Sequence, residues 1–146
     1  MIPAAQSGDP QLAASLLGVQ DEAEWRGIVK RYLADADQAD AQAFDQGADI
    51  DALLSARSRR VDSVLCDAFR RDFDAEPGLC LLATGGYGRG ELFPHSDVDV
   101  LLLIESDQLQ ARERIERFLM RLWDAGLAPG HAVRSLKECL QVGSQD

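Results

Sequence analysis

The feature that most constrains this chain is a glycine-rich loop between two short apolar runs. The runs, residues 79–84 and 98–104, have the length and composition of buried strands. The loop between them contains four glycines and one proline. About a dozen residues of this kind leave no room for the full helix that normally joins parallel strands. We therefore expect two adjacent antiparallel strands, with the start of the loop close to Asp97. The second run shows no polar alternation, so we expect both of its faces to be covered.

The loop does not match either of two common phosphate-binding motifs. A P-loop requires Lys and then Ser or Thr after its last glycine, whereas Gly90 is followed by Glu91 and Leu92. The dinucleotide fingerprint requires the spacing G-x-G-x-x-G, and glycines at positions 85, 86, 88 and 90 do not fit it. A phosphate site here must therefore be of another kind.

Two aspartates stand one residue apart at the start of the second run. On a strand, the side chains of Asp97 and Asp99 point to the same side, with Cα atoms ~6.5 Å apart. Their mutual repulsion would be relieved by Mg²⁺, which prefers oxygen ligands. An aspartate at a strand start is also a common turn residue. Beside a glycine turn whose N–H groups can hold phosphate oxygens, however, the pair predicts metal-assisted phosphoryl or nucleotidyl transfer.

The charge limits the partners. The 146 residues carry a net charge of −10, which argues against a broad nucleic-acid surface because such surfaces are rich in Lys and Arg. A nucleotide that arrives with a divalent cation is not excluded. No apolar run reaches the ~20 residues of a membrane span, and the start, "MIPAAQSGDP", has no features of a secretion signal.

The three cysteines suggest no disulfide framework and no zinc site. Cys66, Cys80 and Cys139 are odd in number, lie far apart and form no C-x-x-C pair. A protein without membrane span, secretion signal or disulfides is expected in the cytoplasm.

Helical patterns surround the two strands. We expect a short helix capped by Asp9, a helix over residues 21–44, and a long amphipathic helix over 50–73 whose five arginines form a solvated face. The polar tract between the two longer helices is either a helix end or a linker. After the second strand, a helix over 107–126 capped by Asp107, a third strand over 131–135, and a capping box of Ser135 with Glu138 are expected.

The stretch "GGYGRGELFPHSDVDVLLLI" resembles the signature of the DNA polymerase beta-like nucleotidyltransferase superfamily. In that signature a Gly-Gly or Gly-Ser turn precedes Asp-x-Asp at the start of a strand. Within the superfamily, "GGYGRGEL" followed by "PHSDVD" is similar to the bacterial uridylyltransferases of the PII nitrogen-regulatory protein. "GLAPGHAVRSLKECL", residues 126–140, also resembles that family. The resemblance covers residues 79–104 and, less closely, 126–140.

The resemblance implies a role for six residues. Asp97 and Asp99 would coordinate catalytic Mg²⁺, and the turn against the triphosphate would be made by Gly85 and Gly86. Ser96 would contact phosphate, as would Arg89, although a turn or surface role for these two is left open.

The resemblance also implies a reaction, the transfer of UMP from UTP to a tyrosine of PII. Tyr87 and His95 are interpreted as structural. An adenylyltransferase of the same superfamily and a non-catalytic regulatory module are the alternatives.

The implied fold is α+β, a small mixed sheet flanked by helices. We expect a helical lead-in over residues 1–50 and a nucleotidyltransferase domain over 51–146 that is truncated at its C-terminus. The superfamily has a third carboxylate on a later strand, and the expected strand at 131–135 carries none. The phosphohydrolase and ACT domains of the full-length family are also missing. An incomplete sheet would expose an edge, giving marginal stability or association through that edge.

Overall fold

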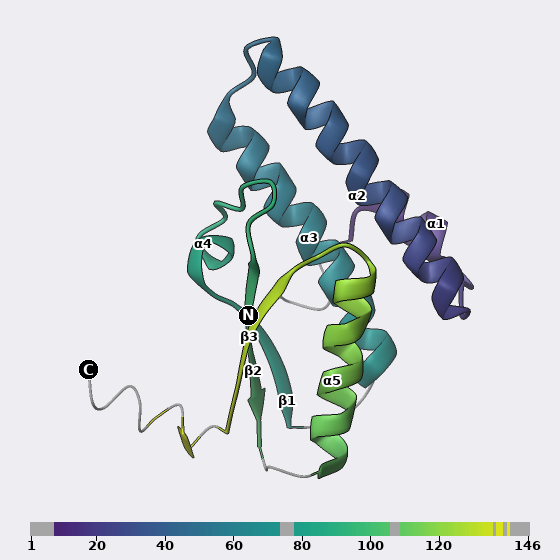
Figure 1. Ribbon diagram of the computed structural model, residues 1–146, viewed down its shortest axis with the longest axis vertical. Helices are drawn as coiled ribbons and strands as arrows, with labels where there is room; N and C mark the ends of the chain where they lie inside the picture. Colours follow the sequence, from purple (N-terminus) through teal and green to yellow (C-terminus); the bar gives the residue numbers. More distant parts are fainter. Residues whose placement is uncertain (1–7, 74–77, 106–108, 136, 139, 141–146) are drawn as a thin grey trace.

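The computed structural model describes residues 8–73, 78–105, 109–135, 137–138 and 140. It confirms an α+β fold in which a mixed sheet is combined with helices (Figure 1). The elements in chain order are α1 (Pro10–Leu16), α2 (Glu22–Asp45), α3 (Ile50–Phe73), β1 (Leu79–Ala83), α4 (Gly85–Gly88), β2 (Val98–Ile104), α5 (Leu109–Asp124) and β3 (Pro129–Ser135).

The described sheet has three strands in the order β1-β2-β3. β1 and β2 pair antiparallel, as the short glycine loop predicts. β3 lies parallel to β2, and α5 makes the crossover that a parallel connection requires. The predicted third strand is confirmed, but it begins two residues earlier than expected, at Pro129. Proline is tolerated there because the first residue of a strand need not donate to the ladder.

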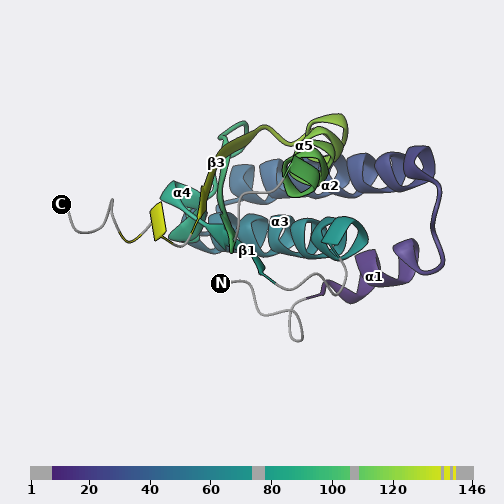
Figure 2. The ribbon, with the colours of Figure 1, turned by 90° about the horizontal axis from the view of Figure 1, so that it is seen from below.

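The two faces of β2 are covered to different extents. Burial alternates along the strand: Val98, Val100, Leu102 and Ile104 are buried, whereas the residues between them are half-buried. The expectation that both faces are covered is therefore wrong for the described residues. The purely apolar run hid the alternation, because leucines occupy both faces. Asp99 belongs to the less covered face. Figure 2 shows α5 on one side of the strands and α4 on the other.

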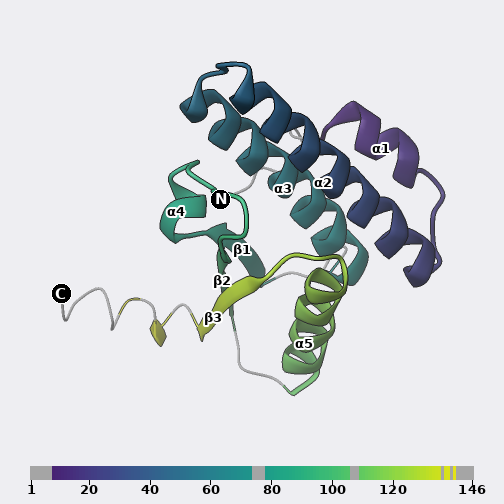
Figure 3. The same cartoon turned by 45° about the horizontal axis from the view of Figure 1, so that its top comes forward.

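The predicted helices are confirmed with small changes at their ends. Asp21 caps α2 by accepting a hydrogen bond from the Glu24 N–H at 3.1 Å, and Asp9 caps α1 in the same way through Gln11 at 2.9 Å. The polar tract left open between helix and linker is helical as far as Asp45. Figure 3 shows α2 and α3 as an antiparallel hairpin, with α1 beside α2.

The arginines of α3 form only part of the solvated face expected from the sequence, because Arg59 and Arg70 are exposed but Arg57 and Arg60 are not. Arg57 and Arg60 form ion pairs with Asp37 and Asp40 of α2, and their side chains are only 11 % and 17 % exposed. The helical pattern located them off the apolar face. It could not show that α2 lies against them and supplies carboxylates.

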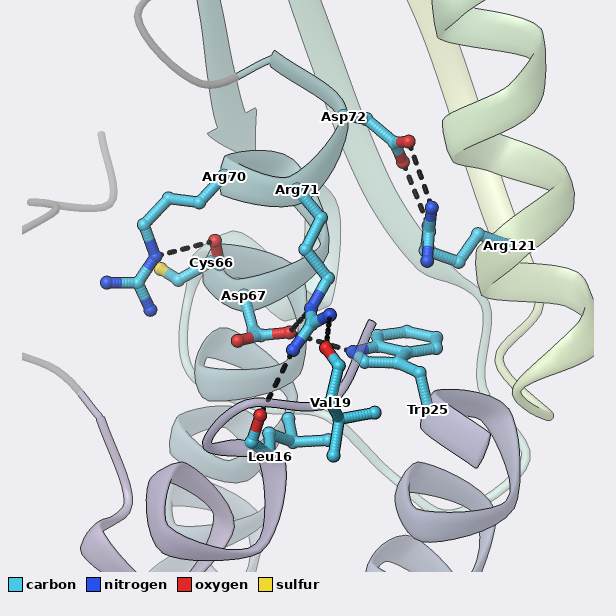
Figure 4. Close-up of polar contacts among 9 residues, drawn as sticks. All are labelled: Leu16, Val19, Trp25, Cys66, Asp67, Arg70, Arg71, Asp72 and Arg121. Carbon is cyan, nitrogen blue, oxygen red and sulfur yellow. Dashed lines mark hydrogen bonds and ion pairs between the residues drawn. The ribbon is translucent and has the colours of Figure 1, made fainter. Parts of the chain in front are cut away.

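Arg71 ties the start of the chain to α3 (Figure 4). Its guanidinium donates to the carbonyl oxygens of Leu16 and Val19 and to the carboxylate of Asp67. The same Asp67 oxygen accepts a hydrogen bond from the indole N–H of Trp25 at 2.7 Å. One cation thus satisfies backbone groups that follow α1 and joins them to α2 and α3.

A second arginine joins α3 to α5. Arg121 donates two hydrogen bonds, of 3.0 and 3.1 Å, to the carboxylate of Asp72. Both side chains are almost fully buried, at 13 % and 6 % exposure, and the guanidinium also lies 5.2 Å from the ring centroid of Trp25. Such bidentate pairs fix orientation as well as energy. This pair sets how α5 packs on the hairpin.

The core is one cluster of apolar side chains from the helices and the sheet. The stripe predicted on α5 is buried there, and Gly126 ends that helix with a φ of +95°. The predicted boundary at residue 50 stays a prediction. The capping box is confirmed, because the Glu138 N–H donates to the Ser135 hydroxyl at 3.1 Å. Asp107 and Cys139 lie outside the described residues.

Candidate active site

The glycine loop opens with a single helical turn, α4. Gly85 has a φ of +58°, a left-handed conformation that favours glycine and turns the chain sharply out of β1. The N–H of Gly88 closes the turn on the carbonyl of Thr84 at 2.8 Å, and the N–H of Thr84 donates to the carbonyl of Asp99 at 2.9 Å. The first N–H groups of such a turn have no acceptor within it. α4 is thereby fixed to the start of β2.

Tyr87 anchors α4 to the helical hairpin. Its side chain is buried, and its hydroxyl donates to the carboxylate of Asp62 on α3. Burial, followed by the hydrogen bond to Asp62, raises the pKa of Tyr87 well above its usual value. Burial also raises the pKa of Asp62, although the hydrogen bond from Tyr87 opposes this. The interpretation of Tyr87 as structural agrees with this placement.

The carboxylate of Asp99 lies between two glycines. A Cβ atom added to Gly85 would lie 2.6 Å from Oδ2 of Asp99. One added to Gly130, the residue paired with Asp99 on β3, would overlap Oδ1 and would lie 3.8 Å from Cβ of Asp97. The two predicted metal ligands therefore both lie beside Gly130, at the point where β2 begins.

A cavity of about 270 Å³ opens beside the two aspartates. Five of the six predicted site residues line it, and Gly85 borders it through its contact with Asp99. Most of the lining is polar or backbone, as a phosphate-bearing ligand requires. The lining residues are Gly86, Tyr87, Arg89, Glu91, Leu92, Phe93, Ser96, Asp97 and Asp99.

Arg89 and Ser96 lie at the rim of the cavity. The Arg89 guanidinium is 67 % exposed and lies 3.5 Å from a carboxylate oxygen of Glu91. Ser96 is exposed, and its N–H donates to the carbonyl of Phe93 at 3.2 Å. Both side chains are accessible to a ligand in the cavity, and their phosphate contacts stay predictions.

The donor set at this site fits Mg²⁺. Asp97 and Asp99 offer hard carboxylate oxygens. The absence of side chains at Gly85 and Gly130 leaves room for the Asp99 carboxylate. Mg²⁺ is commonly bound by one or two carboxylates together with substrate phosphates and water. Within the described part of the chain, no group of three or more His, Cys, Asp or Glu side chains gathers as a metal site. The remaining ligands of a metal here would come from water and from the phosphates of a nucleotide.

Two larger hollows lie away from the aspartates. One, of about 450 Å³, lies between the residues before α1 and α3, and the other, of about 420 Å³, lies between α2, α3 and His95. The charged groups of the second include Asp37 and Arg57, which pair with each other. Neither hollow is lined by Asp97 or Asp99.

A comparison with protein families shows to which family the chain belongs. Residues 23–131 match the family of DUF294 nucleotidyltransferases, a match that includes the glycine loop, both aspartates and Gly130. The chain belongs to this nucleotidyltransferase family.

Curated relatives of this nucleotidyltransferase carry a common name. A protein of Xanthomonas euvesicatoria is 45 % identical over 123 residues, one of Xanthomonas oryzae is 42 % identical over 137 residues, and one of Psychrobacter is 40 % identical over 131 residues. Each is named a bifunctional uridylyltransferase/uridylyl-removing enzyme. The alignments cover 84–93 % of this chain but only 14–15 % of those proteins, so the chain spans a small part of their length.

Sequence reasoning missed one residue of the site and one contact that supports it. Gly130 was left outside the predicted third strand, although a glycine next to a strand signals a close approach of other atoms. The bond from Tyr87 to Asp62 joins residues in separate elements, and nothing in their spacing reveals it.

Proposed function

We propose that this nucleotidyltransferase transfers UMP from UTP to a tyrosine hydroxyl of the PII protein, with Mg²⁺ and with release of pyrophosphate. The observation that carries the proposal is that Asp97 and Asp99 lie beside Gly130 and line one cavity together with Gly86, at the start of α4, and Ser96. The name shared by the relatives supports a uridylyl group as the transferred unit.

Asp97 and Asp99 are proposed to hold the metal, which would neutralise charge that grows on the phosphate oxygens during transfer. The free N–H groups at the start of α4, from Gly85 and Gly86, are proposed to bind the triphosphate. The Arg89 guanidinium at the rim adds positive charge on the same side. These groups orient the α-phosphate for attack, and such positioning supplies much of the rate in reactions of this class.

In the proposed reaction the tyrosine oxygen bonds to the α-phosphorus. The bond between that phosphorus and the oxygen leading to the β-phosphate breaks, pyrophosphate leaves, and the phenol proton passes to water. No covalent enzyme intermediate is required.

The test is calorimetric titration of UTP and of ATP, each with and without Mg²⁺. The chain is compared with Asp97→Asn and with Asp45→Asn, a matched control that removes one charge at an exposed position on α2. We expect UTP to bind only with Mg²⁺ and more tightly than ATP, and binding to be lost in Asp97→Asn alone.

Other outcomes would contradict the proposal in distinct ways. Preference for ATP would favour an adenylyltransferase. Absence of nucleotide binding by a folded chain would favour a non-catalytic module. Where UTP does bind, incorporation of labelled UMP into PII tests the acceptor.

A further inference from the structure

The Asp99 carboxylate occupies a space that exists because two neighbouring residues are glycines. Gly85 borders one carboxylate oxygen and Gly130 borders the other. The two glycines come from α4 and β3, on either side of β2. At Gly85 the left-handed backbone itself favours glycine, so its identity has two explanations. Gly130 has no such backbone requirement, since its φ is not in the left-handed region.

The register of the sheet brings Gly130 to this position. In the parallel ladder Asp99 is paired with Gly130, so a side chain at 130 would lie beside the Asp99 side chain on the same face of the sheet. The backbone of Asp99 is fixed by the ladder and by the hydrogen bond from Thr84. A methyl group at 130 would therefore leave the strand in place and move the carboxylate.

Other glycines of the chain show what distinguishes this one. A Cβ at Gly88 would lie 2.9 Å from the carbonyl oxygen of Ala83, and backbone cannot rotate away. A Cβ at Gly27 would meet nothing within 4 Å. At Gly130 the obstructing atom is the end of an aspartate side chain, which can adopt another rotamer. Glycine is thus needed at position 88 to avoid a clash with the backbone and at position 130 to leave room for the Asp99 carboxylate. At position 27 neither reason applies.

From these contacts we infer that Gly130 is a positioning residue that holds the Asp99 carboxylate where it can bind a divalent cation together with Asp97. The inference rests on the proposed function, because that function assigns the metal to the two aspartates. Mg²⁺ and similar cations demand near-ideal geometry, so displacing one of two carboxylates weakens binding. Changes in residues that orient metal ligands typically weaken affinity about 10- to 100-fold.

The experiment titrates Mn²⁺ into the chain and follows the loss of the free-ion electron paramagnetic resonance signal. It compares the unchanged chain with Gly130→Ala, Gly27→Ala and Asp99→Asn, and records the thermal unfolding of each. We expect Gly130→Ala to bind Mn²⁺ about 10- to 100-fold more weakly while remaining folded. Gly27→Ala should bind as the unchanged chain does.

Each other outcome contradicts a specific statement. Unchanged Mn²⁺ affinity in Gly130→Ala overturns the inference, and so does its failure to fold, because only a side chain should move. Absence of binding by the unchanged chain, or unchanged binding by Asp99→Asn, overturns the proposed function, and the inference then fails with it. The two failures are separated by the Asp99→Asn arm.

Discussion

The helical hairpin of α2 and α3 and the corner around Asp99, made by α4 and the starts of β2 and β3, are held together in different ways. The α2–α3 hairpin and α5 are joined by long charged side chains, above all by the buried pair of Arg121 with Asp72. The corner around Asp99 is shaped by the absence of side chains at Gly85 and Gly130 and by backbone hydrogen bonds. The Arg121–Asp72 pair orients α5 on the hairpin, whereas Gly85 and Gly130 determine where the Asp99 carboxylate can lie.

This difference separates stability from function along the chain. A change in the hairpin should lower the free energy of unfolding without altering the site in molecules that remain folded. A change at Gly130 should alter the site without lowering the free energy of unfolding. The following predictions test that separation, from the largest expected effect to the smallest.

The largest effect is expected from Arg121→Met. Removing the guanidinium leaves the Asp72 carboxylate buried without its partner, which should lower the free energy of unfolding by about 3 kcal/mol. Urea denaturation measures the change. A double variant, Arg121→Met with Asp72→Leu, removes both charges and should recover much of the loss. Failure of that recovery would show that the pair contributes by more than balancing charge.

Gly88→Ala should lower the free energy of unfolding by about 2 kcal/mol, the usual range for forcing an extra methyl group into packed structure. The methyl would press against the carbonyl oxygen of Ala83, which is part of β1. Comparing its unfolding with that of Gly130→Ala isolates the two roles of glycine in this corner. Equal losses in both variants would remove the distinction between them.

Tyr87→Phe tests a hydrogen bond that joins α4 directly to α3. It removes the hydroxyl that donates to Asp62 and should lower the free energy of unfolding by about 1 kcal/mol. Tyr32→Phe is a matched control in the hairpin, because the Tyr32 hydroxyl donates to Asp9 at 2.5 Å. Both should lose stability, but only Tyr87→Phe should also weaken UTP binding with Mg²⁺. Unchanged binding in both would mean that packing alone holds α4.

The smallest effect is a pH dependence from Asp62. Burial raises the pKa of its carboxyl in the folded chain above the ordinary value of 3.8, so the folded state binds more protons than the unfolded state above that pH. This group therefore lowers stability as the pH rises from about 3.8 through the raised pKa. Asp62→Asn should remove that loss, and its stability relative to the unchanged chain should increase over this interval. Asp45→Asn should show no such trend if burial is the cause.

How much the sequence predicts follows the same division. Helical periodicity predicted α2, α3 and α5 and the apolar faces they bury, because a stripe of apolar residues along a helix is stable when it packs against the core. The same pattern could not pair Arg57 with Asp37, since charges on two helices meet only through the packing. The glycine loop and Asp-x-Asp predicted that the start of the loop lies close to the two aspartates, because few other structures require these residue types at this spacing. The role of Gly130 was not predicted, because it depends on the register between β2 and β3.

β3 is synthesised after β2 and α5, so its parallel pairing with β2 forms after the antiparallel strands are complete. β1, α4 and β2 leave the ribosome before α5 and β3, and the antiparallel pair needs only its own loop. Asp97 and Asp99 are therefore present in a nascent chain that still lacks Gly130 and the surface against which the carboxylate rests. Such a chain would carry both ligands without holding them in place. In the proposed site, cation affinity would then appear only after β3 has paired with β2.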